Sequence, residues 1–172
     1  MKKGVPFIVT AGRETREGAG GIIYDIESGL FLLAKRSNGG DAAGTWACFG
    51  GGVDATDISL EHTVGREHWE EAGINVPMRL LKIGTVTYPD GFRFHNFLII
   101  VEETPTITLN EEHTDYVWLA FDELMTNALK LNMHKGFMKA IDTDRFRELC
   151  FYELGLGNPD DLPEAAITYT PE

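Results

Sequence analysis

Basic residues are scarce in this chain of 172 residues, which has 15 lysines and arginines against 27 aspartates and glutamates, so its net charge is −12. Proteins that bind duplex nucleic acid or anionic membranes do so mainly through clustered lysine and arginine side chains. The charge therefore argues against both kinds of partner. A negatively charged substrate would need a cation between itself and the protein, and a bound metal ion is the obvious candidate.

Long apolar runs are also absent, since none exceeds the stretch from Phe97 to Val101, whereas a helix that spans a bilayer needs about 20 such residues. The short apolar stretch after Met1-Lys2-Lys3 does not resemble a secretory signal. The two cysteines, Cys48 and Cys150, form no CxxC motif and no disulfide framework. We therefore expect a cytoplasmic protein with reduced thiols.

The hydrophobic pattern predicts a mixed α/β protein in which helices pack against a sheet. A helix is expected from Ser59 to Ala72, with Asp57 or Ser59 as N-cap and Gly73 at its end. Residues 1–154 are predicted to form one domain, and residues 155–172, which lack lysine and arginine, a loosely held acidic tail. Further strands are predicted at 5–10, 21–25, 30–34, 46–49, 80–88, 92–102 and 116–121, and further helices from 122 and over 144–154.

The predicted helix 59–72 carries an unusual concentration of acid. Glu67, Glu70 and Glu71 share one face, because residues three and four apart are neighbours on a helix, and like charges there cost about 0.2–0.5 kcal/mol per pair. Arg66 is the single basic residue between Asp57 and Glu71, and it can pair with Glu70 four residues on. The spacing alone fits an exposed acidic face as well as a site for a hard divalent cation. A glycine loop at Gly50–Gly52, where backbone can approach an ion or phosphate closely, favours the cation site.

This segment, about residues 51–74, resembles the Nudix box, whose pattern is G-x5-E-x7-R-E-U-x-E-E-x-G-U with U an aliphatic residue. The matching residues are Gly52, Arg66-Glu67, Glu70-Glu71 and Gly73-Ile74. Neighbouring segments extend the resemblance over about residues 19–140: Gly20–Asp25, Leu32–Arg36, Gly44–Trp46, Glu111–His113 and Trp118–Leu119. The resemblance implies a Nudix-type α/β/α sandwich with a mixed β-sheet between helices.

Some positions depart from the family pattern. Ile58 stands where counting back from Arg66 requires the first glutamate, whereas counting forward from Gly51 places Asp57 there. One extra residue in the loop would let Asp57 substitute. His68 and Trp69 also replace the usual residues, and Gly65 costs a helix interior about 1 kcal/mol relative to alanine.

The resemblance implies metal-dependent hydrolysis of a pyrophosphate bond in a nucleoside diphosphate linked to another moiety. The substrate would be a nucleoside triphosphate, a nucleotide sugar or a dinucleotide. Glu67, Glu70, Glu71 and the carbonyl of Gly50 are the expected ligands of Mg²⁺ or Mn²⁺, and Arg66 would hold the glutamates in place. Dimers are common in the family, so a homodimer is one expected state.

The general base is predicted to be Glu67 or Glu112, with His95 and His113 as weaker candidates because isolated histidines are more often structural. Arg36 ends a strand near the expected cleft and is a candidate phosphate contact. Trp46 is a candidate stacking partner for a base. Other aromatic candidates for that role are Phe92, Phe94 and Tyr116.

Two alternatives remain open. The chain could be a nucleotide-binding module that has lost catalysis, as Ile58, His68 and Trp69 suggest. A prenyl diphosphate isomerase is less well supported, because Cys48 is predicted to lie in a strand rather than in a catalytic site.

Overall fold

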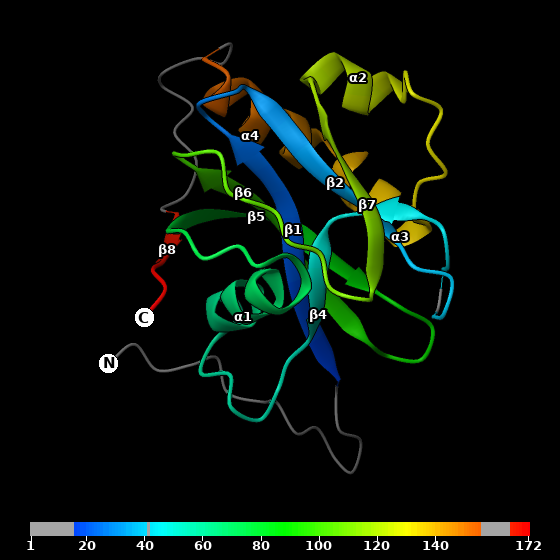
Figure 1. Ribbon diagram of the computed structural model, residues 1–172, viewed down its shortest axis with the longest axis vertical. Helices are drawn as coiled ribbons and strands as arrows, with labels where there is room; N and C mark the ends of the chain where they lie inside the picture. Colours follow the sequence, from blue (N-terminus) through cyan, green and yellow to red (C-terminus); the bar gives the residue numbers. More distant parts are fainter. Residues whose placement is uncertain (1–15, 41, 156–165) are drawn as a thin grey trace.

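The computed structural model describes residues 16–40, 42–155 and 166–172 (Figure 1), so the predicted strand at 5–10 lies outside the described residues. The elements follow one another as β1 (Glu17–Asp25), β2 (Leu30–Arg36), β3 (Trp46–Ala47), β4 (Phe49–Gly52), α1 (Leu60–Ala72), β5 (Met78–Thr87), β6 (Arg93–Val101), β7 (His113–Leu119), α2 (Phe121–Thr126), α3 (Lys135–Ile141), α4 (Asp144–Glu153) and β8 (Ile167–Tyr169).

One mixed sheet contains the strands of the described residues. Its order is β3-β2-β1-β6-β5-β8, while β4 pairs with β1 and β7 pairs with β2. Strands β1 and β6 run parallel along their whole length, and the remaining pairs are antiparallel. The central strand β1 therefore connects the predicted hairpin with β2 to the second half of the chain.

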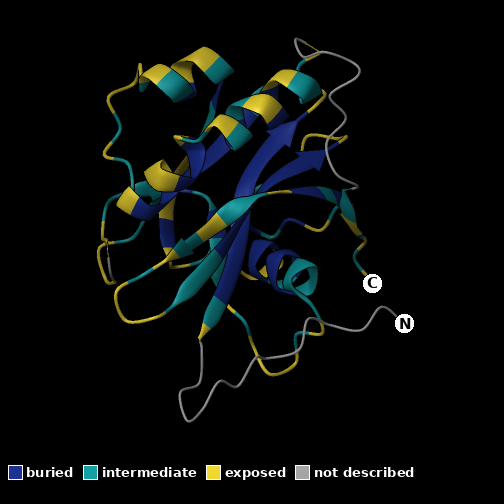
Figure 2. Cartoon of the chain, turned by 180° about the vertical axis from the view of Figure 1, so that it is seen from behind, coloured by how far each residue is buried: buried dark blue, intermediate teal, exposed yellow. Residues whose placement is uncertain are grey.

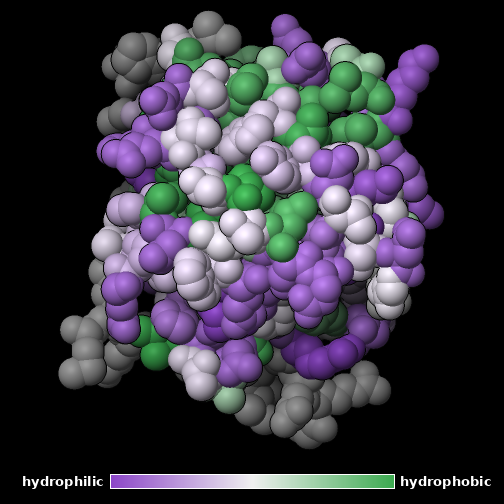
Figure 3. Space-filling view, viewed as in Figure 1, coloured by the Kyte–Doolittle hydropathy of each residue, from purple (hydrophilic) through white to green (hydrophobic). Residues whose placement is uncertain are grey.

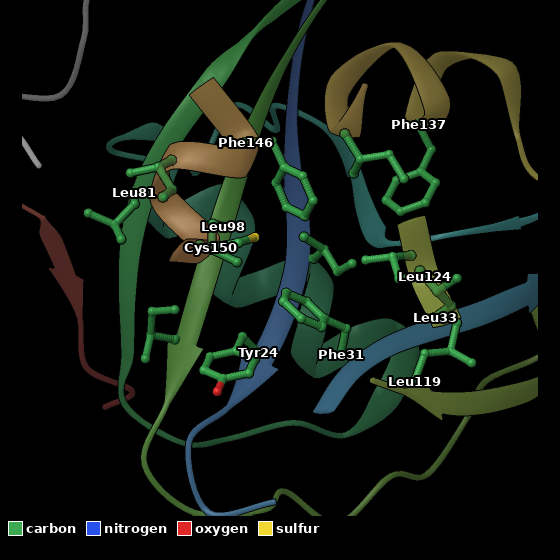
Figure 4. Packing of buried hydrophobic residues seen from close by; sticks show 14 of the residues in the cluster. Tyr24, Phe31, Leu33, Leu81, Leu98, Leu119, Leu124, Phe137, Phe146 and Cys150 are labelled. Carbon is green, nitrogen blue, oxygen red and sulfur yellow. The ribbon is translucent and has the colours of Figure 1, made fainter. Parts of the chain in front are cut away.

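Both faces of the sheet are covered, because successive side chains in a strand point to opposite sides. In β2, Phe31 and Leu33 pack with residues of α2, α3 and α4, whereas Leu32 packs in the cluster that contains Val64 of α1. Figure 2 shows the buried strands behind helices whose outer surfaces are exposed, and Figure 4 shows Phe31 and Phe146 within the first cluster. This arrangement confirms the predicted α/β/α sandwich with a mixed sheet.

Helix α1 begins and ends close to the predicted positions. Ser59 is the N-cap, and its hydroxyl accepts a hydrogen bond from the backbone N–H of His62 at 3.2 Å. Gly73 ends the helix with φ of 64°, a left-handed conformation that glycine adopts readily. The interior packs Val64 and Ala72 against the sheet. Burying a valine side chain contributes about 1.5–3 kcal/mol.

Two expectations need correction. Gly50–Gly52 do not form a loop but belong to strand β4, where Gly50 pairs with Gly20 and Gly51 with Ala19. Two glycine-rich strands can approach closely, and the pairing fixes the glycines more firmly than a loop would. The end of the chain is also less loose than expected, because Ile167–Tyr169 form β8 on the edge of β5. The division into a domain over 1–154 and a tail over 155–172 stays a prediction.

Candidate active site

Arg66 is the centre of a dense polar network at the start of the site. Its Nε and Nη2 donate to Oδ1 and Oδ2 of Asp57, both at 2.9 Å, and Nη2 also donates to the carbonyl of Gly52 at 2.9 Å. Its Nη1 donates to Glu67 Oε1 at 2.8 Å and to Glu70 Oε2 at 3.1 Å. The single guanidinium therefore ties helix α1 to β4 and to the loop between them.

The Asp57 carboxylate is completely buried in this network. It also accepts hydrogen bonds from the backbone N–H of Asp54 and the hydroxyl of Thr63, both at 2.8 Å. Burial alone raises the pKa of Asp57, but the bonds from Arg66 and these other donors outweigh it and hold the pKa well below the usual range. Ile58, by contrast, is 67% exposed. Asp57 is thus the residue that pairs with Arg66, and the loop holds the extra residue.

Glu67 and Glu71 lie against the glycines of β4. A Cβ atom at Gly51 would stand 2.6 Å from Cδ of Glu67, so only glycine leaves room for this carboxylate. The backbone N–H of Gly50 donates to Glu71 Oε2 at 3.2 Å. Glu70 lies further out, with 53% of its side chain exposed. The predicted group of Gly50, Glu67, Glu70 and Glu71 is therefore gathered around one end of β4 and one face of α1.

Negative charge at this site is only partly neutralised. Burial, followed by the negative charge of Glu67, raises the pKa of Glu71 to about 9. Burial also raises the pKa of Glu67, although Arg66 opposes this shift. Hydrophilic side chains gather over α1 and the loop that leads into it (Figure 3). A buried carboxyl with a strongly shifted pKa beside a cavity is typical of a functional site.

These residues fit a divalent cation in their chemistry, because carboxylate and carbonyl oxygens are hard donors of the kind that Mg²⁺ and Mn²⁺ prefer. In the described part of the chain, no three side chains of histidine, cysteine, aspartate or glutamate are already arranged as a metal site. Arg66 instead binds Glu67 and Glu70. A cation here would have to compete with the guanidinium for those two carboxylates.

Glu112 reaches the same region from a different part of the chain. The backbone N–H of Asn110 donates to the carbonyl of Glu71 at 2.9 Å, and the Asn110 side chain accepts from the N–H of Glu112 at 2.9 Å. Ser37 N–H donates to the Glu112 carbonyl at 2.8 Å. The charge of Glu112 contributes to the raised pKa values of Glu67 and Glu71. The loop thus holds an exposed acid close to the buried pair.

A cavity of about 230 Å³ adjoins the glycines of β4. Arg36 lies in its wall, as the sequence analysis expects of a substrate contact. Trp46 is not part of the lining, because its side chain packs against the cluster under α2, α3 and α4, and its contact with a substrate stays a prediction. The full lining comprises Arg36, Ala47, Cys48, Gly50, Gly51, Tyr88, Phe92, Phe94, Asn96, His134, Gly136 and Phe137.

Tyr88, Asn96 and His134 were missed as lining residues. Asn96 stands in a strongly apolar strand, and a buried polar residue at such a position is a signal that could have been used. His134 caps α3, where its Nδ1 accepts from the N–H of Gly136 at 3.0 Å. Nothing in the local pattern around Tyr88 or His134 indicates a cavity.

His95 and His113, the two weaker candidates for the general base, are buried at positions where they pack against or contact neighbouring side chains. His113 is buried edge-on against Phe49, with ring centroids 5.0 Å apart, and burial lowers its pKa to about 4. His95 is buried between Lys82 and Thr85, whose polar atoms lie 3.2 Å from its Nδ1. Neither histidine lines the cavity.

Comparison with known proteins identifies the family. A model of the NUDIX domain matches residues 14–141. The chain belongs to the Nudix hydrolase family. The sequence predictions of the family and of a pyrophosphohydrolase that acts on nucleoside diphosphate derivatives are thereby confirmed.

Individual Nudix proteins are similar over most of the chain. Nucleoside triphosphatase NudI of Escherichia coli is 29% identical over 120 residues, which cover 62% of this chain and 84% of NudI. The MutT protein from Methanosarcina mazei Go1 is 26% identical, with a TM-score of 0.62 over 80% of this chain and 96% of that chain. A bifunctional NMN adenylyltransferase/ADP ribose pyrophosphatase from Francisella tularensis, complexed with AMP and a Mn ion, shares the fold at 17% identity, with a TM-score of 0.61 over 79% of this chain and 42% of that chain.

A search of the helices for membrane spans gives a negative result. Within residues 16–40, 42–155 and 166–172, no helix has both the length and the apolar character needed to cross a bilayer.

The pairing of Asp57 with Arg66 gives the first testable prediction. Asp57→Asn should lower the free energy of unfolding by about 3 kcal/mol at pH 7, because an amide N–H₂ would face groups that all donate to this carboxylate. Ile58→Asn, one position along, should change it by less than about 0.5 kcal/mol, because this exposed side chain makes no such contact. Urea unfolding measures both values.

The contribution of Asp57 to the free energy of unfolding is expected to depend on pH. The lowered pKa of folded Asp57 means that its stabilising effect is complete above the unfolded pKa of about 3.9 and is lost as the pH falls further. The difference in the free energy of unfolding between the wild type and Asp57→Asn should therefore become smaller as the pH falls. An equal or larger effect of Ile58→Asn would contradict the assignment of Asp57.

Proposed function

We propose that the chain hydrolyses a pyrophosphate bond of a small nucleotide, in the first instance a nucleoside triphosphate, with Mg²⁺ or Mn²⁺ as cofactor. The supporting observation is that the same two glycines, Gly50 and Gly51, line the cavity and contact the buried carboxylates Glu71 and Glu67. Such an arrangement puts a bound nucleotide beside the acidic groups. The similarity to NudI supports a triphosphate, while nucleotide sugars and dinucleotides are the next candidates.

Glu67, Glu70, Glu71 and the carbonyl of Gly50 are the residues proposed to hold the cation. When bound, the cation supplies positive charge that offsets the charge of the phosphates and polarises them. The Mn ion in the Francisella neighbour supports this choice of cofactor. Arg66 keeps the helix in place through Asp57, so its hold on Glu70 can be released without loss of the helix position.

Proton transfer from water is proposed to involve Glu67 or Glu112. Glu67 is mostly buried, and burial raises its pKa, which makes it a stronger base than an exposed glutamate. Glu112 is exposed but is held near Glu71 by the backbone of its loop. Either carboxylate can accept the proton from water, while the other stabilises the positive charge of the cation.

The remaining lining residues suit the two ends of a nucleotide. Arg36 is proposed to bind a phosphate, because a guanidinium matches its charge and its geometry. Phe92 and Tyr88, whose ring centroids lie 5.9 Å apart, are proposed to contact the base. The amide of Asn96 in the same wall offers hydrogen bonds to the edge of a base.

A binding module without catalysis is less well supported than a hydrolase. That alternative rested on Ile58, His68 and Trp69. Asp57 makes the contact with Arg66, and His68 packs against Phe49 at 5.6 Å between ring centroids, whereas Trp69 is exposed. Cys48 lies between β3 and β4 rather than in the predicted strand, and it lines the cavity. The isomerase alternative is still the weaker one, because burial raises the pKa of Cys48 to about 12 and keeps the thiol protonated.

The cytoplasmic location, the homodimer and the absence of duplex nucleic acid as a partner stay predictions.

Turnover should depend on both metal and the acidic face of α1. We expect Mg²⁺- or Mn²⁺-dependent hydrolysis within a panel of nucleoside triphosphates, nucleotide sugars and dinucleotides. Glu70→Gln and Glu71→Gln should each lower kcat by about tenfold or more, because each removes a proposed ligand of the cation. Thermal midpoints should be unchanged or higher, because Glu70→Gln relieves charge repulsion on the helix face and Glu71→Gln replaces a buried carboxyl with a group that carries no charge. Glu61→Gln, at the start of the same helix, is the matched control and should keep wild-type kcat. Full activity in both site variants would refute the assignment.

Phe92→Ala should weaken substrate binding more than catalysis. Loss of a stacked ring costs about 1–3 kcal/mol, so KM should rise about fivefold or more while kcat changes little. Leu129→Ala, an exposed apolar residue outside the cavity lining, is the control. An unchanged KM for Phe92→Ala would exclude this ring as a contact of the base.

A further inference from the structure

Helix α1 is held from two opposite sides. Residues 65 and 67 lie about 200° apart around a helix, so Gly65 and Glu67 face in opposite directions. Glu67 lies against Gly51 of β4. Gly65 lies against the ring of Tyr169 in β8, so closely that a Cβ atom at Gly65 would overlap Cζ, Cε1 and Cε2 of that ring. In Figure 1, α1 lies between β8 and β4.

Tyr169 is itself fixed to the sheet. Strand β8 pairs with β5, where Tyr169 is opposite Met78 and Ile167 is opposite Leu80. Both β8 side chains pack against the hydrophobic cluster that contains Val64 of α1. Strand pairing and packing therefore hold the ring in place. The space that the ring needs explains why residue 65 is a glycine rather than a good helix former.

We propose that Tyr169 is a positioning residue of the active site, which presses α1 toward β4 and so keeps Glu67 and Glu71 against Gly51 and Gly50. This inference rests on the proposed function, since it concerns the carboxylates assigned to the cation. Strand β8 would then contribute to catalysis, although it lies outside the matched family domain, which ends at residue 141.

The contact itself is tested by thermal unfolding of four proteins: the wild type, Gly65→Ala, Tyr169→Ala and the double variant. Gly65→Ala should lower the thermal midpoint in the wild-type background, because its methyl group displaces the ring. In the Tyr169→Ala background the same change should raise the midpoint by about 2–4 °C, because alanine is the better helix former and the ring is gone. The same sign in both backgrounds would contradict the contact.

The positioning role is tested by steady-state kinetics with Mn²⁺ as the probe. Tyr169→Ala and Gly65→Ala should each lower kcat about tenfold and raise the Mn²⁺ concentration for half-maximal activity, with KM for the nucleotide within about twofold of wild type. Tyr169→Phe should keep the wild-type kcat and Mn²⁺ requirement, because the ring makes the contact. Thr168→Ala, the exposed neighbour in β8, is the matched control and should be unaffected.

The outcomes separate this inference from the proposed function. A Tyr169→Ala protein with full kcat and an unchanged Mn²⁺ requirement would overturn the positioning role while leaving the hydrolase intact. A wild type without metal-dependent turnover on any substrate would overturn the proposed function, and the positioning role with it. The thermal measurements would then still show whether Tyr169 fixes the helix.

Discussion

The candidate site depends on the contacts that hold several negatively charged side chains of helix α1 in fixed positions. Three carboxylates share a face of α1, and Arg66 pairs with two of them, Glu67 and Glu70. The buried Asp57 carboxylate fixes Arg66 from behind, and Gly51 lets Glu67 come within contact of β4. Glu71 forms no ion pair with Arg66, and its pKa is raised mainly by burial and then by the negative charge of Glu67.

The sequence predicted the parts of the site that lie close together in the chain. The spacing of Glu67, Glu70 and Glu71 identified the acidic face. Gly73 was correctly named as the end of the helix, and Ser59 was one of two candidates for its N-cap. The choice between Asp57 and Ile58 could not be made by counting, since one extra loop residue shifts the count. Burial of one side chain and exposure of the other decide it in the structure.

Contacts between distant segments were harder to predict. Tyr88, Asn96 and His134 come together only because β6 pairs with β1 and β5, and α3 packs beside them. The glycines of β4 were expected in a loop that lets the backbone approach an ion or phosphate. In the structure they lie in a strand, where two backbones approach too closely for side chains. Tyr169 is separated from Gly65 by most of the chain, and no local pattern in its composition indicates that it packs on the helix.

Calorimetric titration of Mn²⁺, in the presence of a non-hydrolysable nucleoside triphosphate analogue, tests the central claim most directly. The account predicts saturable binding to the wild type and affinity weaker by about tenfold or more in the Glu70→Gln/Glu71→Gln double variant, because carboxylates are the ligands. Equal affinity in the two proteins, or no binding to either one, would contradict the account.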